Sequence, residues 1–283
     1  MSYKILNKKI LGPNLKELDI YAPEIAAGAE AGQFVVLRID EYGERIPLSI
    51  AQANKSNGAI KIIFQETGKT TKKLGMLEIG DSIRDFLGPL GLPSDIKKYG
   101  KVICIGGGVG IAAIYPMVSA LKKENNYVIS ILGARTKDML ILEHEVHNSS
   151  QEFYIATDDG SYGVKGFVTD ILKNVVKDNK IDMVFAVGPI SMMKAVFEIA
   201  SEYDIPIKVS LETLMLDGIG MCGACRVYHY GKIKFTCVDG PEFDAYGLNF
   251  DDIANRQKRF KNQEKTSLDI FDKEGKCKCQ KEN

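Results

Sequence analysis

The sequence lacks an excess of charge of either sign, a long hydrophobic run and a secretory signal, and each absence excludes a class of function. Its 283 residues include 37 Lys and Arg and 37 Asp and Glu, so the formal net charge is zero. Without a positive field, the chain is not expected to bind nucleic acid or anionic lipid. Apolar runs such as residues 102–105 are far shorter than the roughly 20 residues that span a bilayer. Residues 1–5 also lack a signal-peptide pattern, so we expect a cytoplasmic protein with no membrane contact.

Four stretches of different character follow one another along the chain. Residues 1–97 contain short β-type segments separated by Gly and Pro, which predicts a small β barrel. Residues 98–211 alternate apolar runs with helical patterns, which predicts an α/β domain with a parallel sheet covered on both faces. Residues 212–255 are rich in glycine and cysteine and include a possible hairpin at residues 226–235. In residues 256–283 we expect a tail with mobile parts.

Three of the six cysteines cluster, and their spacing is the most specific signal in the chain. With a preceding aspartate they form D-x4-C-x2-C-x11-C over Asp217, Cys222, Cys225 and Cys237. Plant-type 2Fe–2S proteins use C-x4-C-x2-C and a distant fourth cysteine, so Asp217 occupies the first ligand position. A carboxylate is anionic, like a thiolate, and also binds iron. The spacing predicts a small 2Fe–2S domain. The alternatives are a Cys3Asp zinc site or a turn without metal, with Asp217 a solvated turn residue.

The other three cysteines carry weaker signals. Cys104 lies alone in an apolar run, whereas Cys277 and Cys279 lie in the tail. A secreted disulfide framework would spread its cysteines through a smaller chain, so the clustering indicates metal binding in a reducing compartment. For Cys277 and Cys279 the alternatives are a loose metal site and a structureless tail, and we expect the tail.

A glycine loop in the second stretch predicts nucleotide binding. It follows the apolar run at residues 101–105 and precedes a helical pattern at residues 111–123. Glycines allow close approach of a pyrophosphate, and the helix N-terminus offers free N–H groups and a positive dipole end. The alternative is a plain tight turn, and Pro116 should kink or shorten the helix. The loop residues are Gly106, Gly107, Gly108, Val109 and Gly110.

Two further positions lie where strands of this predicted sheet end. Gly188 and Pro189 follow the apolar run at residues 183–187, at the edge where such folds bind ligands. At the end of the second strand, where many dinucleotide folds have an acid for the ribose, this chain has Arg135. Arg135 would face a phosphate or the adenine of the nucleotide, or else be a solvated loop residue.

Two motifs in the first stretch predict a flavin site. Arg45, Pro47, Leu48 and Ser49 form R-x-P-L-S at the start of a strand. An arginine pairs with phosphate in fork geometry, and the serine hydroxyl can donate to a flavin ring. The second motif, G-K-T-T, offers small and hydroxyl residues that suit a pyrophosphate. Each motif is common, but together in a barrel ahead of a nucleotide domain they predict FAD. The second set of contacts is Gly68, Thr70 and Thr71.

The order of these motifs resembles the ferredoxin–NADP reductase superfamily. Over residues 1–255 the chain is more closely similar to the electron-transfer subunits of dihydroorotate dehydrogenase B, with further likeness at residues 88–91 and 157–170. Those subunits have Cys at the first cluster position, where this chain has Asp217. The form D-G-x-G-M-C-G-A-C is instead similar to the small (α) subunits of NADH-dependent reduced ferredoxin:NADP oxidoreductases, also described as sulfide dehydrogenases.

This resemblance implies a set of cofactors and a partner. The chain would hold FAD, a 2Fe–2S cluster and an NAD(H) site. A larger subunit would carry a second FAD and 4Fe–4S clusters in a heterodimer or higher complex that bifurcates electrons. The motif residues above match the family's FAD, nucleotide and cluster contacts. One departure is Val187, where the superfamily often has a cysteine before its G-P.

The chemistry follows from the cofactors. A flavin exchanges hydride with a nicotinamide and single electrons with an iron–sulfur cluster, so it stands between them. No proton-transferring residue is required; Ser49, Gly188 and Pro189 would position the rings. The alternatives are a dihydroorotate dehydrogenase B electron-transfer subunit and a redox-sensing module without hydride transfer. Arg135 and Lys137 would suit NADP(H), whereas the resemblance implies NAD(H) here and NADP(H) on the partner.

Overall fold

The computed structural model describes the backbone of residues 3–278 and the side chains of residues 3–273. Its first part is an antiparallel sheet of seven strands in the order β6-β1-β2-β5-β4-β3-β7, curled into a near-closed barrel. The predicted β barrel is therefore confirmed. Its elements are β1 (Tyr3–Gly12), β2 (Leu15–Tyr21), α1 (Pro23–Gly28), β3 (Phe34–Arg38), β4 (Ile46–Asn54), β5 (Ala59–Gln65), α2 (Lys69–Met76), β6 (Ser82–Ile83) and β7 (Asp85–Leu90).

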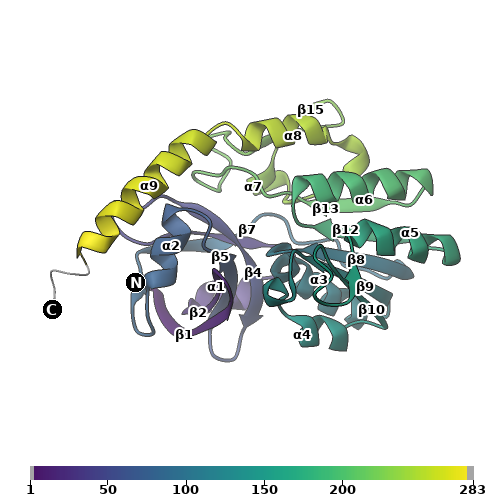
Figure 1. The fold of residues 1–283 in the computed structure, drawn as a ribbon, viewed down its shortest axis with the longest axis horizontal. Coiled ribbons are helices and arrows are strands. Elements are labelled where there is room, and N and C mark those ends of the chain that lie inside the picture. The colour runs from purple at the N-terminus through teal and green to yellow at the C-terminus, as the bar shows by residue number, and fades with distance from the viewer. Residues whose placement is uncertain (1–2, 279–283) are drawn as a thin grey trace.

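The second part is a sheet with helices on both faces (Figure 1). Its order is β11-β10-β9-β8-β12-β13-β16, and all neighbours are parallel except β13 and β16. The elements are β8 (Lys101–Gly107), α3 (Gly110–Lys123), β9 (Tyr127–Ala134), η1 (Lys137–Met139), α4 (Glu143–Asn148), β10 (Glu152–Thr157), β11 (Val164–Lys165), α5 (Val168–Asp178), β12 (Met183–Val187), α6 (Ile190–Glu202) and β13 (Ile207–Ser210). Because β9 and β12 lie on opposite sides of β8, the strand order reverses beside β8, where open α/β sheets bind ligands.

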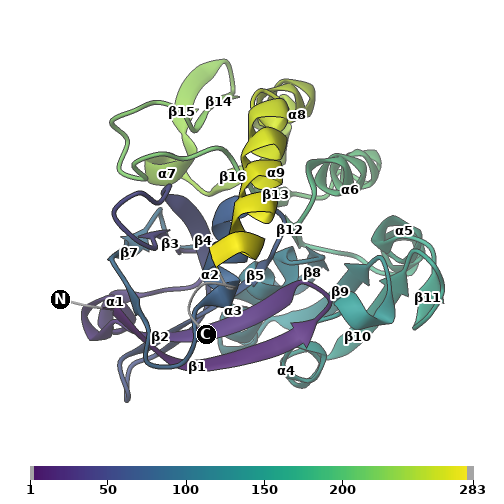
Figure 2. The same ribbon diagram turned by 60° about the vertical axis from the view of Figure 1, so that its left-hand side comes forward.

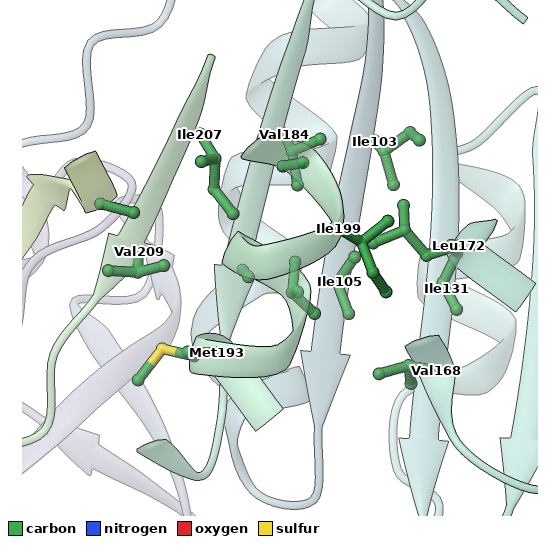
Figure 3. Close-up of a cluster of buried hydrophobic side chains, with 14 of the residues drawn as sticks. Ile103, Ile105, Ile131, Val168, Leu172, Val184, Met193, Ile199, Ile207 and Val209 are labelled. Carbon is green, nitrogen blue, oxygen red and sulfur yellow. The ribbon is translucent and has the colours of Figure 1, made fainter. Parts of the chain in front are cut away.

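Alternation along β8 explains how the parallel sheet is buried on both faces. Ile103 and Ile105 belong to one buried cluster, whereas Val102 and Cys104 belong to another. Successive strand residues point to opposite faces, so β8 has one apolar row under α5 and α6 and a second under α3. Figure 3 shows the first cluster, in which helix residues such as Leu172 meet strand residues.

Helix α3 continues through Pro116 from Gly110 to Lys123. Ile111 and Ile114 before the proline and Leu121 after it are all buried. Packing on both sides of the proline holds the helix in place despite the lost backbone donor. The proline therefore does not confine the regular helix to a shorter segment.

The third part connects the other two. Its elements are β14 (Arg226–His229), β15 (Lys232–Phe235), α7 (Thr236–Asp239), β16 (Glu242–Asp244), η2 (Ala245–Gly247), α8 (Phe250–Gln257) and α9 (Lys261–Lys278). The predicted hairpin is β14 and β15, which pair antiparallel. Strand β16 adds to the edge of the nucleotide-domain sheet beside β13. Helix α8 crosses the predicted boundary at residue 255 and packs on α6, where the rings of Phe197 and Phe250 stack 5.6 Å apart.

The prediction of a structureless tail is wrong for residues 261–278, which form helix α9. This segment contains no proline, five Lys and two Glu, and Lys and Glu favour helix. Helix α9 runs back to the barrel and lies beside α2 in both views (Figures 1 and 2). Cys277 lies on α9, but its side chain and the whole of Cys279 lie outside the described residues, so their role stays a prediction.

Candidate functional site

The nucleotide loop, residues 106–110, is shaped by backbone contacts. Gly108 has a φ of +56°, and its N–H donates to Gly133 O at 2.8 Å. A Cβ on Gly110 would lie 2.5 Å from Val187 O, which is backbone and cannot move aside. Only glycine therefore fits at position 110. A Cβ on Gly108 would meet nothing within 4 Å, so space remains above the loop for a pyrophosphate.

The loop after β12 meets the nucleotide loop directly. A Cβ on Gly188 would lie 3.1 Å from Gly107 O, and Pro189 is the N-cap of α6. Two helix N-termini, those of α3 and α6, thus begin beside the point where the strand order reverses. Helix N-termini favour anions because their first N–H groups have no partner within the helix. The structure brings the predicted nucleotide residues of both loops together.

The loops around Arg135 carry charges of both signs. Arg135 is exposed just after β9, and its carbonyl accepts from Asp159 N at 3.3 Å. Lys137 lies over the ring of Tyr162, 5.0 Å from the ring centre. With Asp138 and Asp158 close by in sequence, the two loops hold two cations against three carboxylates. Lys165 adds a third cation, because its side chain packs on Gly160 of the second loop.

The first flavin motif lies along β4 and just before it. The side chains of Arg45 and Ser49 are exposed, whereas Pro47 and Leu48 are half-buried. Leu48 packs against the barrel core. Because strand side chains alternate, Leu48 anchors the motif in the barrel core, whereas Pro47 and Ser49 lie on the opposite face, where the serine is free to contact a ligand.

The second flavin motif forms the N-terminus of α2, and its hydroxyls already have partners. Thr71 Oγ1 accepts from Gly68 N at 3.0 Å and from Thr67 N at 3.1 Å. Thr70 is buried, and its hydroxyl donates to Glu44 Oε2 at 3.0 Å. A Cβ on Gly68 would meet nothing within 4 Å. The free space and the helix N–H groups fit a pyrophosphate, while both threonines shape the loop; their direct contact with FAD stays a prediction.

Two of the predicted cluster ligands lie together in an apolar setting. Cys225 and Cys237 are each 2% exposed, and their Sγ atoms are 3.3 Å apart. Phe34, Val36 and Met215 complete the buried cluster around them. Burial and the neighbouring Cys225 sulfur raise the pKa of Cys237 to about 12. Both sulfurs are within reach of one metal ion, since metal–sulfur bonds are about 2.3 Å long.

The other two predicted ligands form a second pair. Asp217 Oδ2 accepts from Cys222 N at 2.7 Å, and its Oδ1 accepts from Ile219 N at 3.0 Å. These backbone donors hold the pKa of Asp217 below its usual value, so the carboxylate is anionic and able to bind iron. The side chain of Cys222 is exposed. Within residues 3–273, no three His, Cys, Asp or Glu side chains converge as a metal site.

Glycines give the cluster loop, residues 217–225, its path. Gly218 has a φ of +77°, and a Cβ on it would lie 2.7 Å from Val36 Cγ2 of β3. The loop thus lies directly on the barrel. The residues that sequence reasoning missed are these barrel contacts, chiefly Phe34 and Val36. Their apolar pattern predicts burial, but no local signal in the sequence shows that a segment about 180 residues away covers them.

The three predicted sites meet around two barrel strands. Phe34 and Val36 of β3 pair in register with Ser49 and Pro47 of β4. The cluster cysteines therefore pack on the strand next to the one with the first flavin motif. On the other side, Ala51 of β4 shares a buried cluster with Ile111 of α3. This places the flavin motif between the cluster loop and the nucleotide domain.

Two family models match parts of the chain. The oxidoreductase NAD-binding domain matches residues 104–198, which include the nucleotide loop. The iron–sulfur cluster binding domain of dihydroorotate dehydrogenase B matches residues 212–249, which include all four predicted cluster ligands. Separately, none of the helices within residues 3–278 has both the length and the apolar character to cross a membrane.

Similar proteins cover almost the whole chain. A dihydroorotate dehydrogenase B (NAD(+)), electron transfer subunit homolog from Thermotoga maritima is 44% identical over 268 residues, 95% of each chain. A structure of the NADH-dependent reduced ferredoxin-NADP oxidoreductase, described as giving insights into flavin-based electron bifurcation, has 42% identity and a TM-score of 0.92, covering 96% of this chain and 98% of that one. A ferredoxin reductase in carbazole 1,9a-dioxygenase, at 19% identity and TM-score 0.63 over 74% and 67% of the two chains, shares the fold.

Proposed function

This chain belongs to the family of dihydroorotate dehydrogenase B electron-transfer subunits and their homologues, and we propose that it is the NAD(H)-linked subunit of an electron-bifurcating ferredoxin:NADP oxidoreductase. Membership confirms the predicted oxidoreductase class and the predicted cofactor types: FAD, NAD(H) and an iron–sulfur cluster. An enzyme subunit, not a redox-sensing module, is the interpretation that these findings support.

One observation carries the proposal: β3 separates the cluster cysteines from the flavin motif by a single strand. Cys225 and Cys237 pack against Phe34 and Val36, whose partners on β4 include Ser49. A flavin converts hydride transfer from a nicotinamide into single-electron transfer to an iron–sulfur cluster. The protein's part is to hold the three groups in that order and exclude water between them.

We assign the residues as follows. The backbone of the nucleotide loop and the Gly188–Pro189 turn bind NAD(H), with Arg135 at the edge of the site. Arg45 and the N-terminus of α2 bind the FAD pyrophosphate, and Ser49 contacts the flavin ring. The cluster ligands are Asp217, Cys222, Cys225 and Cys237.

The domain division is also part of this proposal. The FAD-binding barrel spans residues 1–97, the NAD-binding domain 98–211 and the 2Fe–2S domain 212–255, with the segment 256–283 attached. Clustered cysteines that bind a metal are typical of reducing compartments, which supports a cytoplasmic location.

Asp217 distinguishes this proposal from a dihydroorotate dehydrogenase B subunit, in which the first ligand position carries Cys. The similarity to the bifurcating oxidoreductase over nearly the full length of both chains supports the same choice. For the nucleotide, the similarity to the NADH-dependent oxidoreductase supports NAD(H) over NADP(H) in this subunit.

A larger partner subunit with a second flavin and 4Fe–4S clusters completes the proposal. Several apolar side chains are exposed on and beside the cluster loop, including Met221 at 81% and Leu216 at 53%. Exposed apolar patches of this kind mark protein interfaces. Because Cys222 is exposed among them, we place the partner's docking face here, where a cluster would lie close to it.

Anaerobic reduction of the purified chain tests the function. We expect NADH to bleach the flavin absorbance, followed by the appearance of a reduced 2Fe–2S signal in electron paramagnetic resonance. NADPH should require far higher concentrations. Reduction by NADPH at the lower concentration would place the chain on the NADP side, and an oxidised flavin after excess NADH would refute hydride transfer.

Native co-purification tests the partner. We expect a larger chain that contains flavin and 4Fe–4S clusters. Recovery of a dihydroorotate dehydrogenase catalytic subunit in its place would favour the alternative.

A further inference from the structure

A hollow of about 510 Å³ lies between α2 and α9. Its lining comes from Lys69 in the first turn of α2 and from one face of α9 between Asn262 and Phe271. Figures 1 and 2 show α9 lying alongside α2, far in sequence from the barrel that it covers.

Helix α9 is tied to α2 near its far end, and the preceding helix α8 is tied to the nucleotide domain and to the start of the third part. Lys72 Nζ contacts both carboxylate oxygens of Asp272, at 2.8 and 2.9 Å. At its other end α9 follows α8, whose Asp251 pairs with Lys194 of α6 at 2.8 Å. Gln257 at the end of α8 donates to Glu212 O at 2.6 Å. The wall of the hollow is therefore a built part of the fold.

The hollow continues from the proposed pyrophosphate site. Lys69, which lines it, follows Gly68, where an added Cβ would meet nothing within 4 Å. The first α2 amide that bonds back into the helix is Lys72 N, to Gly68 O at 2.9 Å. The amides before it have no partner within the helix and suit a phosphate. A dinucleotide whose phosphates bind there has one of its two ends beside Lys69 and α9.

The chemistry of the lining matches an adenosine. Ile270 and Phe271 offer apolar and aromatic surface for a base, and bases stack on aromatic side chains. Asn262, Gln263 and Ser267 offer amide and hydroxyl groups for the ribose and the base edge. We propose that α9 forms the wall of the adenosine end of the flavin site, so that this chain selects FAD over FMN. This inference rests on the proposed flavin function.

Flavin titration of the full-length apoprotein tests the proposal. FMN has the same isoalloxazine ring but lacks the adenosine, so the two flavins separate the two halves of the site. We expect the wild-type chain to bind FAD more tightly than FMN. Phe271→Ala should weaken FAD binding about tenfold, from the loss of stacking, and leave FMN binding unchanged. The unchanged FMN affinity also reports that the variant is folded.

Asp269→Ala is the matched control, because Asp269 lies on α9, is exposed and does not line the hollow. Its affinity for both flavins should equal that of the wild-type chain. Equal loss of FAD and FMN in Phe271→Ala, or no loss of FAD, would overturn the adenosine site. Wild-type protein that binds FMN as tightly as FAD would also overturn it while sparing the flavin function. Wild-type protein that binds neither flavin would refute both.

Discussion

The nucleotide loop and the cluster loop are both rich in glycine, yet they are held in different ways. In the nucleotide domain, Gly110 fits against backbone atoms of β12, and Gly188 fits against backbone atoms of β8. Both close contacts are between protein atoms and need no ligand. In the cluster loop, two of the four proposed ligands are buried as a sulfur pair, while Cys222 is exposed and Asp217 is bonded to backbone amides. The nucleotide loop is therefore shaped by contacts within the chain, whereas the proposed cluster ligands lie apart as two pairs.

This difference suggests two ways to build a redox protein. A site for a diffusible nucleotide must be preformed, since it binds and releases its ligand repeatedly. A site for a resident cluster needs only part of its shape in the chain, because metal–thiolate bonds supply folding energy themselves. Substitutions should therefore damage the two loops in different ways. In the cluster loop we expect loss of local folding, and in the nucleotide loop we expect loss of binding while the fold stays intact.

The largest effect is expected at the buried sulfur pair. Cys225→Ser should abolish the cluster and loosen residues 212–240, because one of two buried ligands is replaced by a poorer one and the surrounding apolar cluster loses its anchor. Iron and sulfide analysis should fall from about two of each per chain to near zero. Limited proteolysis should then show new cleavage in this stretch.

Cys104→Ala is the control for that experiment. Cys104 is also a buried cysteine, but it lies in β8 within the core of the nucleotide domain. Its iron content should match that of the unmodified chain. Full iron and sulfide in Cys225→Ser, or an equal loss in Cys104→Ala, would contradict the assigned ligand set.

The opposite behaviour is expected at the nucleotide loop. Gly110→Ala places a methyl group 2.5 Å from Val187 O, so the two loops must move apart, at a cost typical of overpacking, about 1–3 kcal/mol. NADH affinity should fall about tenfold or more, since a ligand gripped by backbone amides is sensitive to such a shift. Cluster content should be unchanged. Gly28→Ala in α1, where the nearest atom is 3.9 Å away, should leave NADH affinity unchanged.

Asp217 sharpens the comparison, because it has two possible roles in the cluster loop. As a ligand it needs its charge, whereas as an acceptor for Cys222 N and Ile219 N it needs only an oxygen. Asp217→Asn keeps an oxygen but removes the charge, and we expect it to lose or destabilise the cluster. Asp217→Cys should retain a cluster with altered spectra and potential. If Asp217→Asn keeps normal spectra and stability, the residue is a turn acceptor and not a ligand.

The features that the sequence predicted correctly are those formed by residues close together in the chain. The nucleotide loop, the R-x-P-L-S strand and the ligand spacing are local patterns with specific chemistry, and they lie on the expected turns and strands. The apolar runs that alternate with helical patterns likewise predicted a parallel sheet covered on both faces, and the structure divides Ile103 and Val102 between those faces. Local spacing could not show that β16 joins the nucleotide-domain sheet.

Helix α9 shows the limit most clearly. Its composition permits a helix but is polar and charged, with a weak apolar face, so nothing in the segment itself shows a surface on which it packs. Its position depends on contacts such as Lys72–Asp272, whose partners lie 200 residues apart. The hydroxyl groups of Thr70 and Thr71 show the same limit on a smaller scale. The Thr70 hydroxyl already donates to Glu44, and the Thr71 hydroxyl already accepts from Thr67 N, and the sequence does not reveal either hydrogen bond.

The smallest effect is expected at Thr71, in a loop that is intermediate between the other two. Its hydroxyl accepts from the amides of Thr67 and Gly68 and so closes the N-terminus of α2 on itself, as in a capping box. Thr71→Ala should remove about 1 kcal/mol of stability, which for a chain of this size lowers the melting temperature by about 2–4 °C. Thr71→Ser keeps the hydroxyl and should retain most of that stability.

Comparing FAD affinity in the two variants then separates the shaping of the loop from direct contact with the cofactor. If Thr71→Ala loses FAD affinity far beyond its loss of stability while Thr71→Ser does not, the hydroxyl binds the cofactor itself. If the melting temperature of Thr71→Ala equals that of the unmodified chain, the hydroxyl does not hold the loop, and α2 is positioned by its packing alone.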